Sequence, residues 1–122
     1  MAQITEDYVS FETAKLLKEK GFDEECFAAY NGNGKLYKFN EEVDDNTPCW
    51  SDAPTLQMTM KWLREVHNIH IEPRYFPMPN IYRYVIIHSP ATIENIDSHP
   101  RYFSSYEEAC EAAIKYCLEN LI

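Results

Sequence analysis

Two segments of eight residues, 69–76 and 81–88, constrain the fold more than any other part of the sequence. The first alternates apolar and polar residues, the pattern of a half-buried β-strand, and the Pro-Met-Pro-Asn sequence between the two segments is typical of a turn. Pro73 has no N–H group to donate to a neighbouring strand, which favours a sheet edge for residues 69–76. Residues 81–88 carry apolar side chains on both faces, which indicates a central strand. The sequence therefore predicts a β-hairpin whose first strand is an edge strand.

Three amphipathic helices are expected in addition, near residues 10–20, 55–67 and 105–120. Ser10 can cap the first helix, and Gly21 can take the left-handed conformation that ends it. Ser104 or Ser105 can cap the third helix, because each is followed three residues later by a glutamate. At 100° per residue, the apolar arc of the second helix comprises Leu56, Met60, Trp62, Leu63 and Val66.

A second, shorter hairpin is predicted between Cys26 and Asn40, with its turn at the Asn-Gly-Asn-Gly sequence of residues 31–34. Two long connections, 40–53 and 89–103, show no regular pattern, and their roles stay open. The expected element order is α-β-β-α-β-β-α. We therefore expect a two-layer α+β fold, with a mostly antiparallel sheet of about four strands and three helices. A chain of 122 residues has the size of a single domain, 1–122.

The charge balance argues against direct binding to nucleic acid. Twenty acidic residues outnumber eleven basic ones, which gives a net charge of −9, whereas binding to a phosphate backbone needs clustered Lys and Arg. No apolar run approaches the length of about 20 residues that spans a bilayer, and the first residues lack the features of a signal peptide. These observations indicate a cytoplasmic protein with reduced cysteines.

No catalytic or cofactor motif stands out in the sequence, and we expect no cofactor. His67 and His70, with Glu72 just beyond, are the best candidates for metal ligands. The helix expected at 55–67 ends between the two histidines, so they fall on different elements and no spacing forces them onto one ion. Cys49 is the cysteine expected in a loop, but no basic residue nearby would lower its pKa. An enzyme is therefore disfavoured, although a small hydrolase or metal-dependent enzyme stays an alternative.

The predicted edge strand carries a candidate interface. Tyr75, Phe76, Met78 and Tyr82 would give this edge an aromatic surface of the kind enriched at interface cores, suited to a protein partner or to self-association. The competing interpretation is that these rings fold inward and that Pro73 only protects the edge against aggregation.

Three segments carry a resemblance that covers most of the chain: VSFETAKLLKEKGF, APTLQMTMKWLREVHNIHIEP and YEEACEAAIKYCLENLI. They are similar to a family of small uncharacterised proteins from gut anaerobes and their phages or prophages. The resemblance implies a mobile-element setting and no particular activity. The leading functional hypothesis is a non-enzymatic accessory protein of phage or prophage origin that acts through protein contacts. An acidic inhibitor, which mimics nucleic acid and occupies a nucleic-acid-binding protein, is the first alternative.

Overall fold

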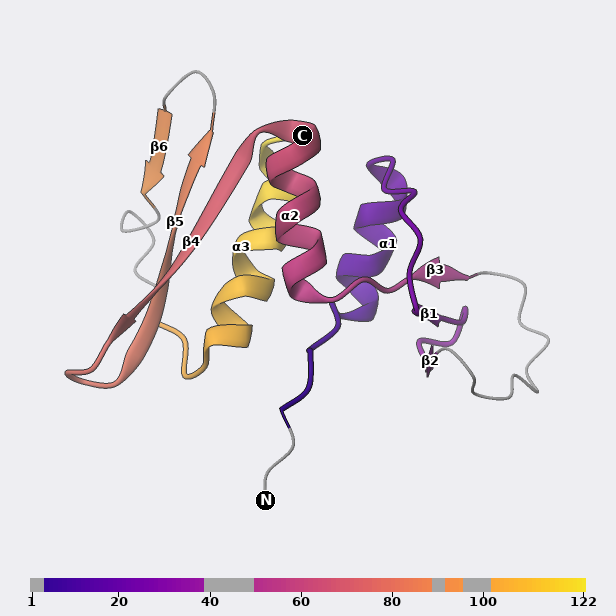
Figure 1. Ribbon diagram of the computed structural model, residues 1–122, viewed down its shortest axis with the longest axis horizontal. Helices are drawn as coiled ribbons and strands as arrows, with labels where there is room; N and C mark the ends of the chain where they lie inside the picture. The colour runs from indigo at the N-terminus through magenta and orange to yellow at the C-terminus, as the bar shows by residue number, and fades with distance from the viewer. Residues whose placement is uncertain (1–3, 39–49, 89–91, 96–101) are drawn as a thin grey trace. The chain divides into compact units, whose positions relative to one another are not determined.

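The computed structural model describes residues 4–38, 50–88, 92–95 and 102–122. Within these ranges the element order is α1-β1-β2-β3-α2-β4-β5-β6-α3 (Figure 1). The chain forms two compact units, Met1–Thr55 with one helix and Leu56–Ile122 with two, and within the described ranges each unit has its own three-stranded antiparallel sheet. The expectation that 1–122 is a single domain stays a prediction.

Helix α1 (Phe11–Glu19) begins and ends as its sequence predicts. The Ser10 side chain accepts a hydrogen bond from the Thr13 N–H, which satisfies one of the free donors of the first turn. At the other end Gly21 has a φ of 88°, and the Phe22 N–H donates to the Leu17 carbonyl at 3.0 Å. These contacts form a Schellman motif, in which a left-handed glycine lets the chain turn back over the last helical turn.

The sheet of the first unit has the order β2-β1-β3. Strands β1 (Ala28–Tyr30) and β2 (Leu36–Lys38) form the predicted short hairpin. Buried Asn31 organises its turn, because its side-chain oxygen accepts hydrogen bonds from the N–H groups of Asn33 and Lys35, both at 2.9 Å. Strand β3 (Ser51–Asp52) pairs with β1 on the other side and returns the chain to the core, where Ala53 and Pro54 are buried.

In the second unit, helices α2 (Leu56–His67) and α3 (Tyr106–Asn120) pack on one face of the sheet β4-β5-β6 (Figure 1). Strands β4 (Ile69–Phe76) and β5 (Ile81–His88) form the long hairpin at the predicted bounds, and β6 (Thr92–Asn95) pairs with the far end of β5. The core between these layers is made of aliphatic, aromatic and cysteine side chains, among them Leu63, Ile69, Ile71, Ile86, Ile114, Cys117 and Leu118.

The structure confirms the α+β class, the three helices and the antiparallel pairing, and it refines the sheet. The strands are divided between two small sheets instead of lying in one sheet of about four, because β1 pairs with β2 and β3 while β5 pairs with β4 and β6. Each of the two long connections predicted from the sequence contains a short strand, β3 in 40–53 and β6 in 89–103. Val66, placed in the apolar arc of α2 by its spacing, is 57% exposed, so that prediction was wrong. No helix in the described ranges is long and apolar enough to cross a membrane.

Candidate functional site

The outer edge of β4 is the first component of the candidate site. The order β4-β5-β6 confirms both positions inferred from the sequence, with β4 at the edge and β5 in the centre. In the part of the chain that the structure describes, β4 pairs along one side only, with β5, over all eight of its residues. Its other side therefore presents backbone groups that lack a strand partner within the described residues.

The hydrogen bonds around Tyr82 show which residues of β4 present those groups. The N–H and carbonyl of Tyr82 bond reciprocally with Phe103, at 2.8 and 2.9 Å, on the side of β5 away from β4. In an antiparallel ladder, successive residues direct their backbone groups to opposite sides, so Tyr82 and its β4 partner Tyr75 form a pair without mutual hydrogen bonds. The unbroken register then directs outward the backbone groups of every second residue of β4, namely Ile69, Ile71, Pro73 and Tyr75.

This alternation of backbone directions places the nitrogen of Pro73 on the outer edge of β4, away from β5. Because its nitrogen faces the outer edge, the missing N–H removes no hydrogen bond between β4 and β5. The outer edge thus offers donors at Ile69, Ile71 and Tyr75, and carbonyl acceptors at these residues and at Pro73. Side chains of the same four residues lie on the helix-facing side of the sheet, where Ile69 and Ile71 are buried.

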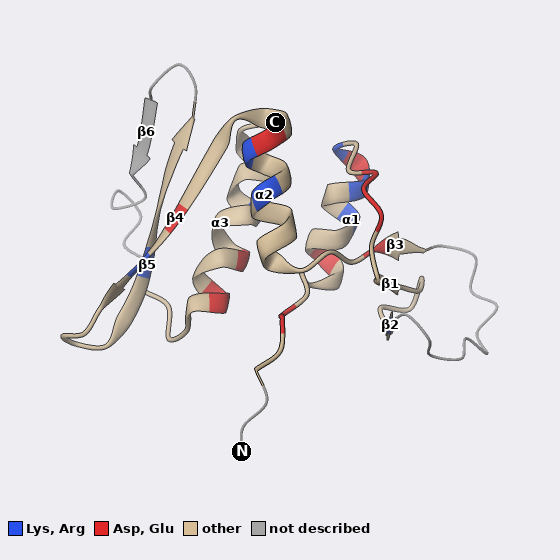
Figure 2. Cartoon of the chain, viewed as in Figure 1, with Lys and Arg blue, Asp and Glu red and all other residues tan. Residues whose placement is uncertain are grey.

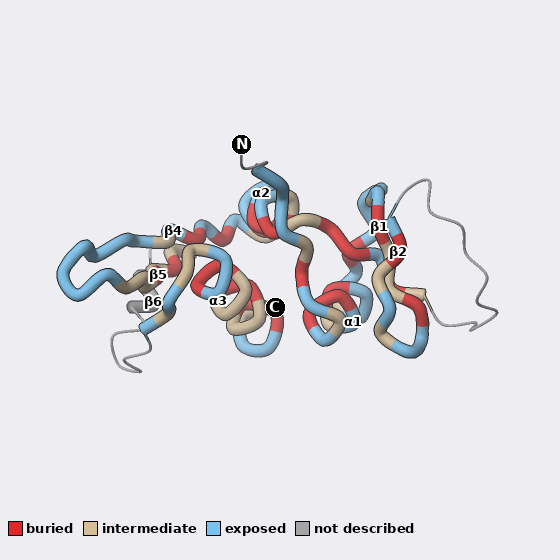
Figure 3. Tube along the Cα trace, turned by 90° about the horizontal axis from the view of Figure 1, so that it is seen from below, coloured by how far each residue is buried: buried red, intermediate tan, exposed pale blue. Residues whose placement is uncertain are grey.

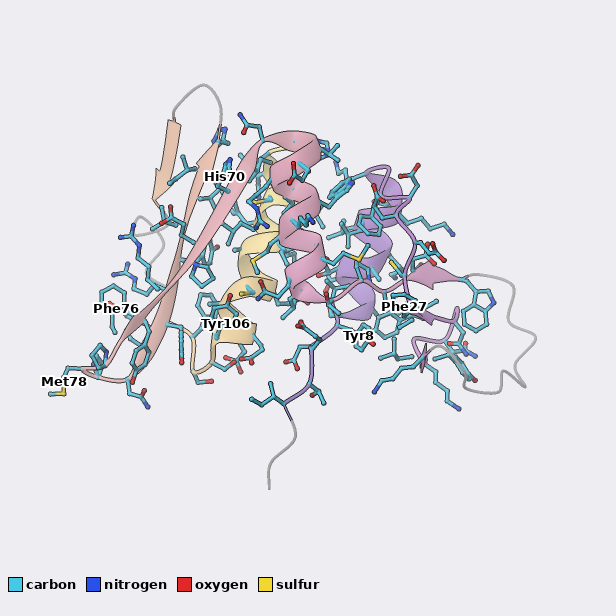
Figure 4. The ribbon with its side chains drawn as sticks, in the orientation of Figure 1. Tyr8, Phe27, His70, Phe76, Met78 and Tyr106 are labelled. Atoms are coloured by element: carbon cyan, nitrogen blue, oxygen red, sulfur yellow. The ribbon has the colours of Figure 1, made fainter. Side chains whose placement is uncertain are left out.

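The tip of the hairpin is the second component, and we call Tyr75, Phe76, Met78 and Tyr82 together the tip surface. Tyr75, Phe76 and Met78 are 51%, 39% and 88% exposed, so these side chains do not fold into the core. The Tyr75 and Tyr82 rings are in contact, with centroids 4.9 Å apart, and the Tyr75 hydroxyl donates to Asn80 Oδ1 at 2.7 Å. Figure 3 shows the tip as a continuous exposed stretch, and Figure 4 shows Phe76 and Met78 at its far end.

Tyr106, a residue not assigned to the site from the sequence, extends the tip surface toward α3. Its ring meets the Tyr82 ring edge-on at 6.4 Å, and its hydroxyl accepts a hydrogen bond from Gln57 Nε2 at 3.0 Å. Burial raises the pKa of the Tyr106 hydroxyl, and the hydrogen bond from Gln57 opposes this shift in part. The sequence feature that could have indicated this role is the position of Tyr106 at the start of the third helix, on its apolar face.

Charges on the outward face of the sheet form the third component. Glu72 and Arg74 of β4 lie 3.8 Å apart, and both side chains are exposed. Arg83 lies directly across from Arg74 in the ladder and places its guanidinium 5.2 Å from the Tyr102 ring centroid. On the face of the sheet away from the helices, β4 therefore presents in sequence order the His70 ring, the Glu72 carboxylate, the Arg74 guanidinium and the Phe76 ring.

The candidate metal ligands do not converge in the structure. His67 ends α2 and sets its ring edge-on against Trp62, at 4.7 Å, and its buried Nε2 has no hydrogen-bond partner among the described residues. His70 and Glu72 share the opposite, exposed face of the sheet. His70 Nε2 lies 3.2 Å from Asn68 Oδ1, and Glu72 pairs with Arg74. Within the described ranges no three His, Cys, Asp or Glu residues are grouped as a metal site would require.

The cysteines in the described ranges are free thiols of low reactivity. Burial, reinforced by Asp52 and Glu24, raises the pKa of Cys26 to about 11, and burial raises that of Cys117 to about 12. Burial likewise raises the pKa of Cys110 to about 11. A nucleophilic cysteine needs the reverse shift, so these three thiols are unsuited to that role. Cys49, the loop candidate, lies outside the described residues.

Comparison with known protein families, with curated proteins and with solved structures finds no match to this chain.

Proposed function

We propose that this protein is a non-enzymatic accessory protein that binds a partner protein by strand addition at the outer edge of β4. The observation that supports this proposal is the edge itself, a strand of eight residues with outward backbone groups, next to the exposed tip surface. Main-chain hydrogen bonds along such an edge supply affinity, while side-chain contacts on either side supply specificity. The setting that we propose is a mobile element, which is what the resemblance of three segments implies, and the cytoplasm, which is what the sequence features of the chain favour.

Pro73 at the middle of the edge and the net charge of the chain favour a different protein over a second copy of this chain. A symmetric antiparallel pair centred on Glu72 would set this carboxylate against its own copy, and like charges directly opposite are destabilising. A pair centred on Pro73 would set Glu72 against Arg74 of the other copy, but it would also set two prolines face to face at the centre, with no donor between them. Two copies would also bring together two net charges of −9.

The partner's sequence can be described from the same register. An antiparallel strand added to β4 would place one partner residue opposite Arg74 and another, two positions later, opposite Glu72. Complementary charge calls for an acidic residue at the first position and a basic one at the second. The partner residues that precede the acidic position would reach the tip surface, where aromatic or large aliphatic side chains would bury Phe76 and Met78.

The experiment is site-specific photo-crosslinking in the native host, followed by hydrogen exchange on the purified complex. A benzophenone amino acid replaces Tyr75, and the same amino acid at Lys61, an exposed residue of α2, is the matched control. We expect an adduct with one other protein at position 75 only, and its loss when Phe76→Asp is added.

Strand addition makes a specific claim about the backbone of β4. In the reconstituted complex, the amides of Ile69, Ile71 and Tyr75 should exchange about tenfold or more slowly, because they gain partners, while those of His70 and Glu72 are already bonded to β5. Uniform exchange along β4 with and without the partner would refute strand addition. An adduct of this chain with itself would show that the occupant is a second copy and would refute the choice of partner.

A second candidate function, the acidic inhibitor of a nucleic-acid-binding protein, is favoured by the distribution of charge. Residues 1–55 contain twelve acidic and five basic residues, so most of the net charge lies there. Asp23, Glu24 and Glu25 follow α1, and both Glu24 and Asp52 act on the Cys26 thiol, so these carboxylates gather around one part of the unit (Figure 2). Such an array would compete with phosphates for basic side chains.

This second candidate is tested by competition. A fluorescent DNA duplex is bound to a basic DNA-binding protein of the native host, and the full chain is added at several salt concentrations. An inhibitor displaces the duplex, more weakly at higher salt, and Asp23→Asn with Glu24→Gln reduces the displacement while Glu119→Gln, on α3, does not. Displacement that is absent, or unchanged by the paired substitution, would count against this function.

A further inference from the structure

We propose that a pocket in the first unit binds a small zwitterion of the α-amino acid class. The pocket lies between α1, the segment that follows it and β3, and it has a volume of about 260 Å³. It is lined by Ala14, Lys18, Phe22, Asp23, Trp50 and Asp52. This volume lies just below the range of roughly 300–1,000 Å³ that is typical of pockets for drug-sized ligands, which suits a smaller ligand.

Three of the residues that line the pocket, Ala14, Phe22 and Trp50, are apolar or aromatic and at least half-buried. Ala14 and Phe22 are buried, and the Schellman motif after α1 holds the backbone of Phe22 in place. The half-buried Trp50 ring contacts the buried Tyr37 ring, with centroids 5.5 Å apart. Two aromatic side chains in fixed positions can cover the apolar part of a small ligand without a large loss of side-chain entropy.

The rim carries charges of both signs that do not neutralise one another. Lys18 Nζ donates to the Trp50 carbonyl at 2.9 Å and, among the described residues, lies within 4.0 Å of neither Asp23 nor Asp52 carboxylate oxygens. An ammonium group has three donors, so two of those on Lys18 are left for an acceptor or for water. The pocket thus offers donors at Lys18 and acceptors at the two aspartates, over an aromatic floor.

This arrangement selects a ligand with both charges. A simple amine would bond to the aspartates but would meet the Lys18 ammonium, and a simple carboxylate would have the opposite conflict. A free amino acid satisfies both ends, with its carboxylate on Lys18, its ammonium on Asp23 or Asp52, and an apolar side chain against Phe22 and Trp50. This site lies wholly in residues 1–55, so its test is independent of strand addition at β4.

The experiment compares three probes that differ only in charge: L-phenylalanine, phenethylamine, which lacks the carboxylate, and 3-phenylpropionate, which lacks the ammonium. Each is titrated into the full chain, and amide and indole chemical shifts of Phe22, Asp23, Trp50 and Asp52 are followed. We expect saturable binding of phenylalanine with a dissociation constant on the order of 1 mM, and binding about fivefold or more weaker for the two analogues.

Substitutions then show which residue of the pocket binds the carboxylate of the ligand and which binds its ammonium group. Lys18→Met should reduce the affinity for phenylalanine to that for phenethylamine and leave phenethylamine binding unweakened, while Asp23→Asn with Asp52→Asn should reduce it to that for 3-phenylpropionate. Lys15→Met, on the same helix but with its ammonium over the Phe11 ring, is the control and should change nothing. Because Lys18, Asp23 and Asp52 are exposed, these variants should keep the wild-type spectrum elsewhere. Shifts that do not saturate, equal affinity for all three probes, or full affinity in Lys18→Met would overturn the proposal.

Discussion

Alanine substitutions at Gly21 and Gly34 separate two contributions to the free energy of unfolding: the cost of a left-handed backbone and the cost of crowding the Phe11 ring. Both have left-handed backbones, with φ of 88° and 85°. A Cβ added at Gly21 would meet nothing within 4 Å, whereas one at Gly34 would lie 3.1 Å from Phe11 Cδ2 and 3.4 Å from Phe11 Cε2. Gly21→Ala should therefore lower the free energy of unfolding by about 1 kcal/mol, the cost of a left-handed alanine alone.

Gly34→Ala should lower it by about 2 kcal/mol, because the Phe11 ring must also move away from the new methyl group. That ring also contacts Tyr30, with centroids 5.5 Å apart, so moving it disturbs a second contact. Urea unfolding of wild type and both variants, followed by circular dichroism, measures the two changes, provided that the slopes agree.

A double-mutant cycle shows whether the excess comes from Phe11. In a Phe11→Ala background, Gly34→Ala should cost about 1 kcal/mol, no more than Gly21→Ala, because the crowded ring is gone. The reasoning fails if the two glycine variants are equally stable, or if the cost at Gly34 is the same with and without the Phe11 ring.

Three further predictions concern caps, core and thiols. Ser105→Ala should cost about 1 kcal/mol, because its hydroxyl accepts a hydrogen bond from the Glu108 N–H at the start of α3, and thermal unfolding would show this. Leu63→Ala should cost about 3 kcal/mol while Val66→Ala costs less than about 0.5, and equal costs would contradict the burial of Leu63. Cys117 has an ordinary pKa of 9.0 that burial raises to about 12, so the folded state disfavours its thiolate. The contribution of Cys117 to the free energy of unfolding should then be constant below pH 9 and fall as pH rises from 9 toward 12, and Cys117→Ala should reduce the slope in that range.

The elements that the sequence predicts well are those with local signals. The bounds of β4 and β5 follow from an alternating pattern, a turn sequence and one proline, and the bounds of α1 follow from a capping serine and a left-handed glycine. Strands β3 and β6 are only two and four residues long, and their pairing partners lie elsewhere in the chain. No local pattern can indicate such strands, and without them the division into two sheets cannot be inferred.

The candidate site likewise has features that local sequence signals predict and features that they do not. An edge position for β4 follows from Pro73, and the exposed rings follow from their place beside a turn. The pocket in residues 1–55 could not be predicted, because its lining comes from two segments, 14–23 and 50–52, that only tertiary packing brings together. Val66 has the spacing of a core residue, but packing leaves it exposed, since periodicity cannot tell how far a neighbouring element extends.

The alternation of backbone directions along β4 also bears on how this protein can evolve. Ile69 and Ile71 are fixed by the core, and their backbone groups face outward whatever side chains surround them. The arrangement is the opposite at His70, Glu72 and Arg74. Their backbone groups are bonded to β5, and their side chains are exposed on the face of the sheet away from the helices. Substitutions at these three positions can therefore change which sequences pair well with the edge while the hairpin stays folded. Under the proposed strand addition, natural variants of this chain could thus exchange one partner for another with few mutations and little loss of stability.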